Sequence, residues 1–158
     1  MALPTYTLTE GGGAAGLAPA LDDVQRFLSH LAVAHRVRRV FVAGYSAGGI
    51  LVQHLATTPA RASVCGGASA AGALVSVYGA TTEGRLDVGS FPMLFWNGVD
   101  DRLVPLNATL AAIARYAELG LPHELYRLPT GHNVMGFVFP NGTTFATASK
   151  AFLDASCA

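Results

Sequence analysis

A serine between glycines is the first residue of this sequence that could do chemistry. Gly44-Tyr45-Ser46-Ala47-Gly48 has the pattern G-x-S-x-G. In this pattern a sharp turn between a strand and a helix exposes the serine hydroxyl, and glycines are expected because the turn leaves no room for neighbouring Cβ atoms. An apolar run at residues 39–43 precedes the motif, and helical spacing resumes at residue 50. The alternative is a plain glycine-rich turn, which a chain with 18 glycines could contain by chance.

A serine nucleophile needs a general base, and the base needs a carboxylate to orient it. Residues 92–105 read as an apolar strand that ends in a glycine and in an acidic loop with Asp100 and Asp101. His132 stands further on, in a loop after another predicted strand. The chain order Ser, Asp, His is the order expected when the serine sits in a turn of this kind. We therefore interpret His132 as the base.

The other histidines fit packing or surface positions better. His30, His35 and His54 fall on or at the edge of predicted helices, and His123 stands at the entrance of a predicted strand. None of them occupies a loop after a strand, where the sites of parallel α/β sheets form.

Short apolar runs alternate along the chain with longer segments of helical spacing. We expect strands at residues 5–8, 39–43, 74–78, 93–96 and 124–128, and helices at residues 20–34, 50–56, 106–119 and 145–153. This alternation predicts βαβ units and a mostly parallel sheet covered on both faces, which is a three-layer α/β/α sandwich. The length of 158 residues predicts a single domain over residues 1–158.

Composition limits the kinds of molecule that the chain could bind. Ten Lys and Arg balance ten Asp and Glu, so no basic surface for nucleic acid is expected, and a small-molecule substrate fits better. No apolar run is long enough to span a bilayer, and residues 1–6 do not resemble a secretory leader, which predicts a cytoplasmic chain.

Cys65 and Cys157 define neither a metal site nor a disulfide framework, so we expect two thiols. Asn107 and Asn141 match the glycosylation pattern, which matters only on a secretory route.

Several segments together resemble the α/β-hydrolase superfamily, of the esterase and lipase type. Gly44 to Gly49 resembles the Gly-Asp-Ser-Ala-Gly-Gly of hormone-sensitive-lipase-like carboxylesterases, with Tyr45 in place of the aspartate. Residues 98–105 resemble a Gly-x-x-Asp-x-x-Val-Pro pattern, which puts the acid at Asp101 and makes Asp100 its neighbour. Residues 6–8, 19–24, 119–125 and 131–132 carry further parts of the likeness.

The resemblance implies a Ser46–His132–Asp101 triad and acyl transfer through a serine ester, with the Ala47 amide as an oxyanion donor. It implies no metal and no cofactor. A carboxylic ester is the expected substrate, although a thioesterase, an amidase, a peptidase or an acyltransferase could use the same residues. A catalytically silent fragment that acts as a binding protein is the other hypothesis.

The likeness is that of an N-terminally shortened member of the superfamily. The loop that supplies the second oxyanion donor in the family would precede residue 6, and Gly11, Gly12 and Gly13 are a weak replacement for it. If the first strands are missing, an exposed sheet edge could pair with a second copy. A missing natural N-terminus would also leave secretion open. Little chain remains for a cap over the site, which favours small or short-chain esters.

Overall fold

The computed structural model describes residues 5–6, 14–57, 64–72 and 90–158. Within them a four-stranded sheet has the order β1-β2-β3-β4, and every neighbouring pair is parallel. The elements are α1 (Ala14–Ala34), β1 (Val40–Tyr45), α2 (Ala47–Leu55), β2 (Val64–Ala70), β3 (Met93–Gly98), α3 (Leu106–Glu118), β4 (His123–Leu128) and α4 (Phe145–Ser156).

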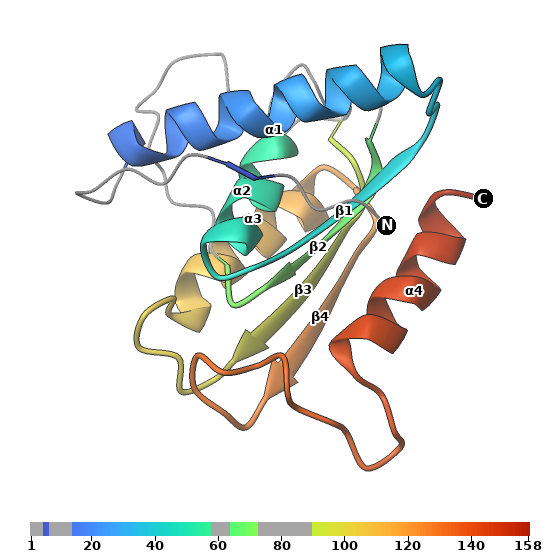
Figure 1. Ribbon diagram of the computed structural model, residues 1–158. Coiled ribbons are helices and arrows are strands. Elements are labelled where there is room, and N and C mark those ends of the chain that lie inside the picture. The colour runs from blue at the N-terminus through green and yellow to red at the C-terminus, as the bar shows by residue number, and fades with distance from the viewer. Residues whose placement is uncertain (1–4, 7–13, 58–63, 73–89) are drawn as a thin grey trace.

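Helices cover both faces of the sheet (Figure 1), with α1, α2 and α3 on one side and α4 on the other. Each face has its own apolar core. Leu28, Leu55 and Phe95 belong to the core under the first three helices, whereas Trp96 and Phe152 belong to the core under α4. The sandwich predicted from the alternation of strands and helices is therefore confirmed, because each helix buries an apolar stripe against one face of the sheet.

Most element boundaries lie close to those expected. Helix α1 begins earlier than residue 20 and contains Pro19. The strand β2 was not predicted, because Val64–Ala70 reads VCGGASA and lacks the large β-branched side chains that signal a strand. The strand expected at residues 74–78 lies outside the described residues. Of the strand expected at residues 5–8, only residues 5 and 6 are described, and they belong to no strand.

The expectation of two thiols is wrong, since Cys65 and Cys157 form a disulfide. Cys65 lies in β2, and Cys157 follows α4, which packs on the sheet with its last turn beside the start of that strand. Their Cα atoms are 5.2 Å apart, within the range that a disulfide spans. Arg39, which stands just before β1, also holds the residues after α4 against the sheet. Its guanidinium donates to the backbone carbonyls of Cys157 and Ala158.

The strands differ in burial across the sheet. All six residues of β3 are buried, whereas Ala43 and Tyr45 of β1, an edge strand of the described sheet, are exposed. Association of two copies through this edge stays a prediction. No helix among the described residues has the length and apolarity that a membrane crossing requires.

Candidate active site

Ser46 lies in the turn between β1 and α2, with an unusual backbone conformation. Its φ is 52° and its ψ is −117°, which few residues other than glycine adopt. The surrounding hydrogen bonds hold this conformation in place. The Ser46 amide donates to the carbonyl of Ala70 in β2 at 2.9 Å, and the Ser46 carbonyl accepts from the Ile50 amide at 3.0 Å. This is the sharp strand-to-helix turn that the motif predicts.

The two glycines of the motif differ in how much space surrounds them. A Cβ on Gly44 would overlap the carbonyl group of Gly48, so the first turn of α2 can approach β1 only if residue 44 is glycine. A Cβ on Gly48 would meet only the Tyr6 hydroxyl, at an ordinary 3.8 Å. The steric reason given for both glycines therefore holds for Gly44 and not for Gly48.

His132 connects Ser46 to Asp101. Its Nε2 lies 2.9 Å from the Ser46 Oγ, and its Nδ1 lies 2.8 Å from the Asp101 Oδ2. Ser46 follows β1, Asp101 follows β3, and His132 follows β4, so all three come from the carboxyl ends of parallel strands. The three residues predicted from the sequence thus lie in one hydrogen-bonded row, although 86 positions separate Ser46 from His132.

The Asp101 carboxylate is fully enclosed and saturated with donors. Its side chain is 0% exposed, and its Oδ1 accepts from the amides of Leu103 and Val104, each at 2.9 Å. Burial alone would raise the pKa of the Asp101 carboxyl. The hydrogen bonds from Val104, His132 and Leu103, together with the charge of a protonated His132, outweigh burial and leave that pKa below its ordinary value. Asp101 is therefore held ionised beside the imidazole, whereas the exposed Asp100 makes no such contact.

Gly98 allows the acidic loop and the histidine loop to touch. A Cβ on Gly98 would overlap the carbonyl oxygens of Thr130 and Gly131. The Asp100 amide also donates to the Thr130 carbonyl at 3.1 Å. These contacts explain why a glycine ends β3, because any larger residue would push His132 away from Asp101.

Tyr45 joins the serine turn directly to the histidine loop. Its hydroxyl donates to the backbone carbonyl of His132 at 3.1 Å, and the two rings lie with centroids 5.4 Å apart. The sequence singled out Tyr45 only as a departure from the family pattern. Its role could have been suspected from its position next to Ser46, since a long polar side chain there can reach across the site.

A buried polar network behind the turn also escaped the sequence analysis. The Gln53 Nε2 donates to the Ser69 Oγ and to the Gly72 carbonyl, each at 2.9 Å. The Ser69 hydroxyl in turn donates to the Gly49 carbonyl at 3.0 Å. These bonds fix the first turns of α2 against the end of β2. They therefore help to hold Ser46, which directly precedes α2, in its position.

Ala47 is the first residue of α2. Backbone amides in the first turn of a helix have no acceptor within the helix, so they can donate to an anion in front of it. This position suits the predicted role of the Ala47 amide as an oxyanion donor. Gly11, Gly12 and Gly13, the weak candidates for a second donor, lie outside the described residues.

The structure does not bring the other histidines to Ser46. The rings of His30 and His35 contact each other at 5.2 Å, and the Nδ1 of His123 lies 2.9 Å from the Leu121 carbonyl. His54 is buried on α2, and burial lowers its pKa. Among the described residues, no group of three His, Cys, Asp or Glu side chains is arranged to hold a metal ion.

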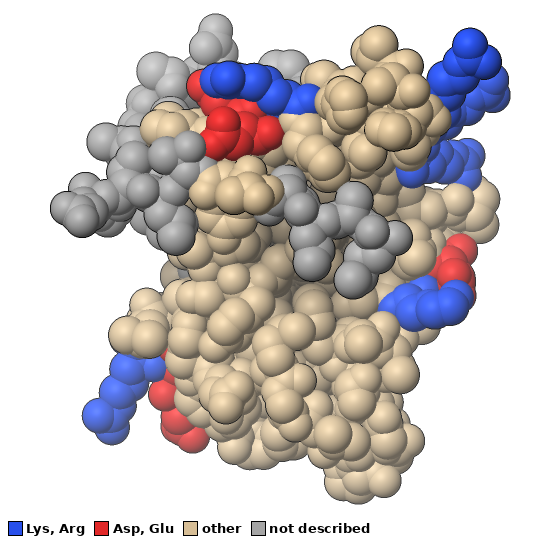
Figure 2. Space-filling model, in the orientation of Figure 1, with Lys and Arg blue, Asp and Glu red and all other residues tan. Residues whose placement is uncertain are grey.

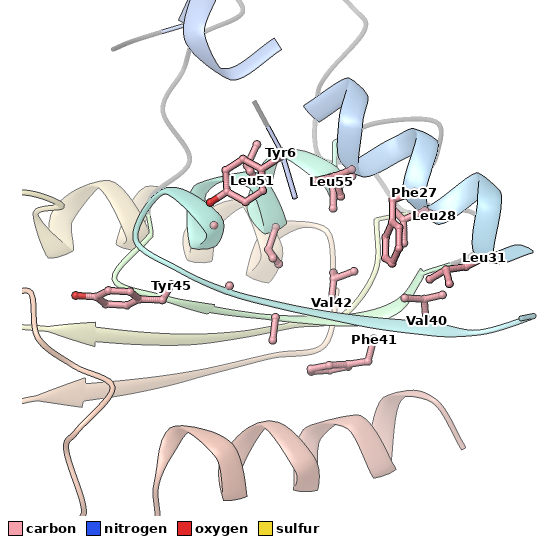
Figure 3. A pocket seen from close by; sticks show the side chains of 15 residues that line it. Tyr6, Phe27, Leu28, Leu31, Val40, Phe41, Val42, Tyr45, Leu51 and Leu55 are labelled. Carbon is pink, nitrogen blue, oxygen red and sulfur yellow. The ribbon is translucent and has the colours of Figure 1, made fainter. Parts of the chain in front are cut away.

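An apolar cavity of about 340 Å³ lies beside the site, between α1, α2 and β1 (Figure 3). Gly44, Tyr45 and Gly48 line it at the serine turn, and Leu31 of α1 lines it as well. Among the described residues on its wall, the only polar side-chain groups are the hydroxyls of Tyr6 and Tyr45, and none of the three residues of the hydrogen-bonded row contributes to it. The cavity is therefore a neighbour of the row and not its mouth.

No protein-family model and no curated protein sequence matches the chain. Solved structures do match. The chain resembles MGS-M1, an α/β-hydrolase enzyme from a Medee basin deep-sea metagenome library, with 23% identity and a TM-score of 0.66 over 96% of this chain and 66% of that one. It resembles esterase PE8 with 20% identity and a TM-score of 0.67, over 96% of this chain and 69% of the esterase.

The Bacillus cereus carboxylesterase matches with 13% identity and a TM-score of 0.70, over 95% of this chain and 68% of the carboxylesterase. The chain thus spans about two thirds of the length of each of these neighbours. At such low identity the likeness concerns the fold. The parallel sheet, its flanking helices and these neighbours together show that the chain has the α/β-hydrolase fold, which these esterases and hydrolases share.

Proposed function

We propose that this chain is a serine hydrolase that cleaves small or short-chain carboxylic esters, with Ser46 as nucleophile, His132 as general base and acid, and Asp101 as the orienting carboxylate. The observation that carries the proposal is the row of two hydrogen bonds through His132, at 2.9 Å to Ser46 and 2.8 Å to Asp101. Nucleophile and base within hydrogen-bond reach, with the base oriented by a third group, is the arrangement that activates a serine.

In the first half of the reaction, the Ser46 Oγ attacks the ester carbonyl carbon while the His132 Nε2 takes the hydroxyl proton. The Asp101 Oδ2 accepts from the Nδ1–H and stabilises the imidazolium that forms. The Ala47 amide donates to the carbonyl oxygen as it becomes negative. His132 then returns the proton to the departing alcohol, which leaves the acyl group on Ser46.

In the second half, His132 takes a proton from water, and the resulting hydroxide equivalent attacks the acyl carbon. The second tetrahedral adduct collapses, the carboxylic acid leaves, and Ser46 recovers its proton from His132. No residue outside the row, apart from the Ala47 amide, has to exchange a proton or accept charge in this scheme.

The experiment is labelling with a fluorophosphonate probe, together with hydrolysis of p-nitrophenyl butanoate. We expect the wild-type chain to be labelled and active, and the Ser46→Ala variant to be neither. Circular dichroism of both proteins controls for folding. Absence of labelling on folded wild-type protein would favour the other hypothesis, a silent hydrolase-like chain that binds a partner.

We also propose a change of expected compartment. Disulfides persist in oxidising surroundings and are rare in the cytosol. The Cys65–Cys157 bond therefore favours an extracytoplasmic setting over the cytoplasm, which was expected from residues 1–6 and from the lack of a membrane-spanning apolar run. Counting the free thiols of protein that is alkylated during isolation tests this compartment. Two free thiols per chain would favour the cytoplasm instead.

A further inference from the structure

The loop that carries His132 runs over residues 129–144, between β4 and α4, and forms neither helix nor strand. It contains no Lys, Arg, Asp or Glu, and the lower part of Figure 2, where it lies, is mostly tan. The structure describes every residue of this loop, and Val134 alone among them is buried. The position of His132 therefore depends on few contacts, of which those of Val134 reach furthest into the core.

Val134 is hydrogen-bonded through both its amide and its carbonyl. The amide donates to the His132 carbonyl at 2.9 Å, and the carbonyl accepts from the Trp96 indole Nε1 at 3.0 Å. The Phe137 amide reaches the Val134 carbonyl at a longer 3.3 Å. A continuous series of hydrogen bonds thus joins the Trp96 indole to the backbone of His132.

Trp96 is itself held firmly in place. It is a fully buried residue of β3, five positions before Asp101. Its ring lies against those of Tyr126, Phe139 and Phe145, with centroids 4.8, 5.6 and 5.9 Å away. An indole can only donate, and these neighbours fix the direction of its N–H. The strand that leads to the carboxylate therefore also anchors the loop that brings the histidine to it.

We propose that Trp96 is a positioning residue for His132. Its indole N–H acts through Val134 and holds the imidazole in line with Ser46 and Asp101. This inference rests on the proposed function, in which His132 exchanges protons with Ser46. Without the indole donor, the buried Val134 carbonyl loses its shorter hydrogen bond and the loop can shift. A displacement of about 1 Å near reacting groups can lower a rate about 10²-fold.

The test uses the fact that the chain contains a single tryptophan, so that biosynthetic incorporation of an analogue changes Trp96 alone. In β-(3-benzothienyl)alanine a sulfur replaces the indole N–H at nearly the same shape, whereas 5-fluorotryptophan keeps the N–H. With p-nitrophenyl butanoate, kcat per fluorophosphonate-titrated site should fall about 10- to 100-fold in the benzothienyl protein, at a KM within about twofold of wild type. The 5-fluorotryptophan protein should keep the wild-type kcat and KM.

Conventional variants separate positioning from stability. Trp96→Phe removes the N–H with part of the ring and should lower kcat at least as much; the analogues serve as well if this variant does not fold. Phe152→Leu weakens the same core, and Tyr116→Phe removes a buried donor to the Phe91 carbonyl, at 3.1 Å, in the other core. Both controls should lower the free energy of unfolding and keep kcat per titrated site.

A second readout does not depend on turnover. The Nδ1–H of His132, 2.8 Å from the Asp101 Oδ2, should give a proton resonance at low field. The benzothienyl protein should shift or broaden this resonance, and the 5-fluorotryptophan protein should keep it.

Three kinetic results would overturn the inference. They are a wild-type kcat in the benzothienyl protein, a rise in KM alone, and an equal fall of kcat in Phe152→Leu. If folded wild type cleaves no ester, the proposed function fails, and the resonance of His132 then decides alone. A shift in the benzothienyl protein would support the positioning role of Trp96, and an unchanged resonance would refute it.

Discussion

Replacing Asp101 by asparagine should abolish most of the activity, whereas the same change at Asp100 should be mild. The two residues are neighbours in sequence, but their side chains differ in exposure and in hydrogen bonding. The Asp101 side chain is 0% exposed and accepts from two backbone amides and from His132. Asp100 is exposed, and only its backbone amide is engaged, with Thr130.

The expected loss in Asp101→Asn follows from what a side-chain amide does in that place. The amide oxygen would keep the bonds from Leu103 and Val104, so the NH₂ group would face the His132 Nδ1, which lies 2.8 Å from the present Oδ2. An NH₂ group donates, which forces the imidazole proton onto Nε2, where it blocks the uptake of the Ser46 proton. The same substitution in the type case of a serine triad lowers kcat by about 10⁴, which corresponds to about 5.4 kcal/mol of transition-state free energy.

The assay is kcat for p-nitrophenyl butanoate, normalised to the fluorophosphonate-titrated fraction of wild type and to the folded fraction of each variant. We expect Asp101→Asn to lose three to four orders of magnitude and Asp100→Asn to stay within about threefold of wild type. If Asp100→Asn is the more damaging of the two, the hydrogen-bonded row through His132 and Asp101 is not the working site.

The lowered pKa of Asp101 adds a stability measurement to the same pair of variants. Because the pKa is lower in the folded chain than in the unfolded one, the carboxylate contributes stability above the unfolded value of about 3.9. That contribution is lost as the pH falls through the lower folded value. The free energy of unfolding should therefore drop less steeply below pH 4 in Asp101→Asn than in wild type or in Asp100→Asn.

Further predictions concern the serine turn, the disulfide, the hydrogen bond from the Tyr45 hydroxyl and the buried His54. Gly44→Ala should destabilise the chain by about 2 kcal/mol or more in urea unfolding, whereas Gly48→Ala should be nearly neutral, since only the former Cβ overlaps backbone. Cys157→Ser should lower the free energy of unfolding by about 2–4 kcal/mol and make it insensitive to reductant. Tyr45→Phe should lower kcat about tenfold at unchanged KM. A roughly tenfold rise in KM at unchanged kcat would contradict a positioning role for Tyr45. Burial lowers the pKa of His54, so wild-type stability should fall by up to about 1.4 kcal/mol per pH unit below pH 6.5, and His54→Gln should flatten that slope.

The site could be predicted from the sequence further than the fold around it. Ser46, the acidic loop and His132 each follow a strand, and strand ends of a parallel sheet converge, so local patterns were enough to bring them together. The choice of Asp101 over Asp100 came from the family resemblance. The strand β2 could not be predicted, because its small residues are chosen for close packing on both faces and carry little local strand signal.

Two further features depend on tertiary structure alone. The disulfide joins residues 92 positions apart, and nothing local marks Cys65 or Cys157 as partners. The contact between the Tyr45 hydroxyl and the histidine loop likewise depends on where β1 and β4 end relative to each other, which no pattern within either strand encodes.

The sequential strand order has a consequence for how the chain folds. Among the described strands, each pairs with the next one along the sequence, so this part of the sheet can grow by adding neighbouring units, with modest loop closure at every step. The contact between Ser46 and His132 is different, since it closes over 86 positions and requires β4 to have joined the sheet. Ser46 should therefore become reactive toward the probe late in refolding. Quenched labelling during refolding from urea would then time the last assembly step, whereas circular dichroism would follow the earlier growth of the sheet.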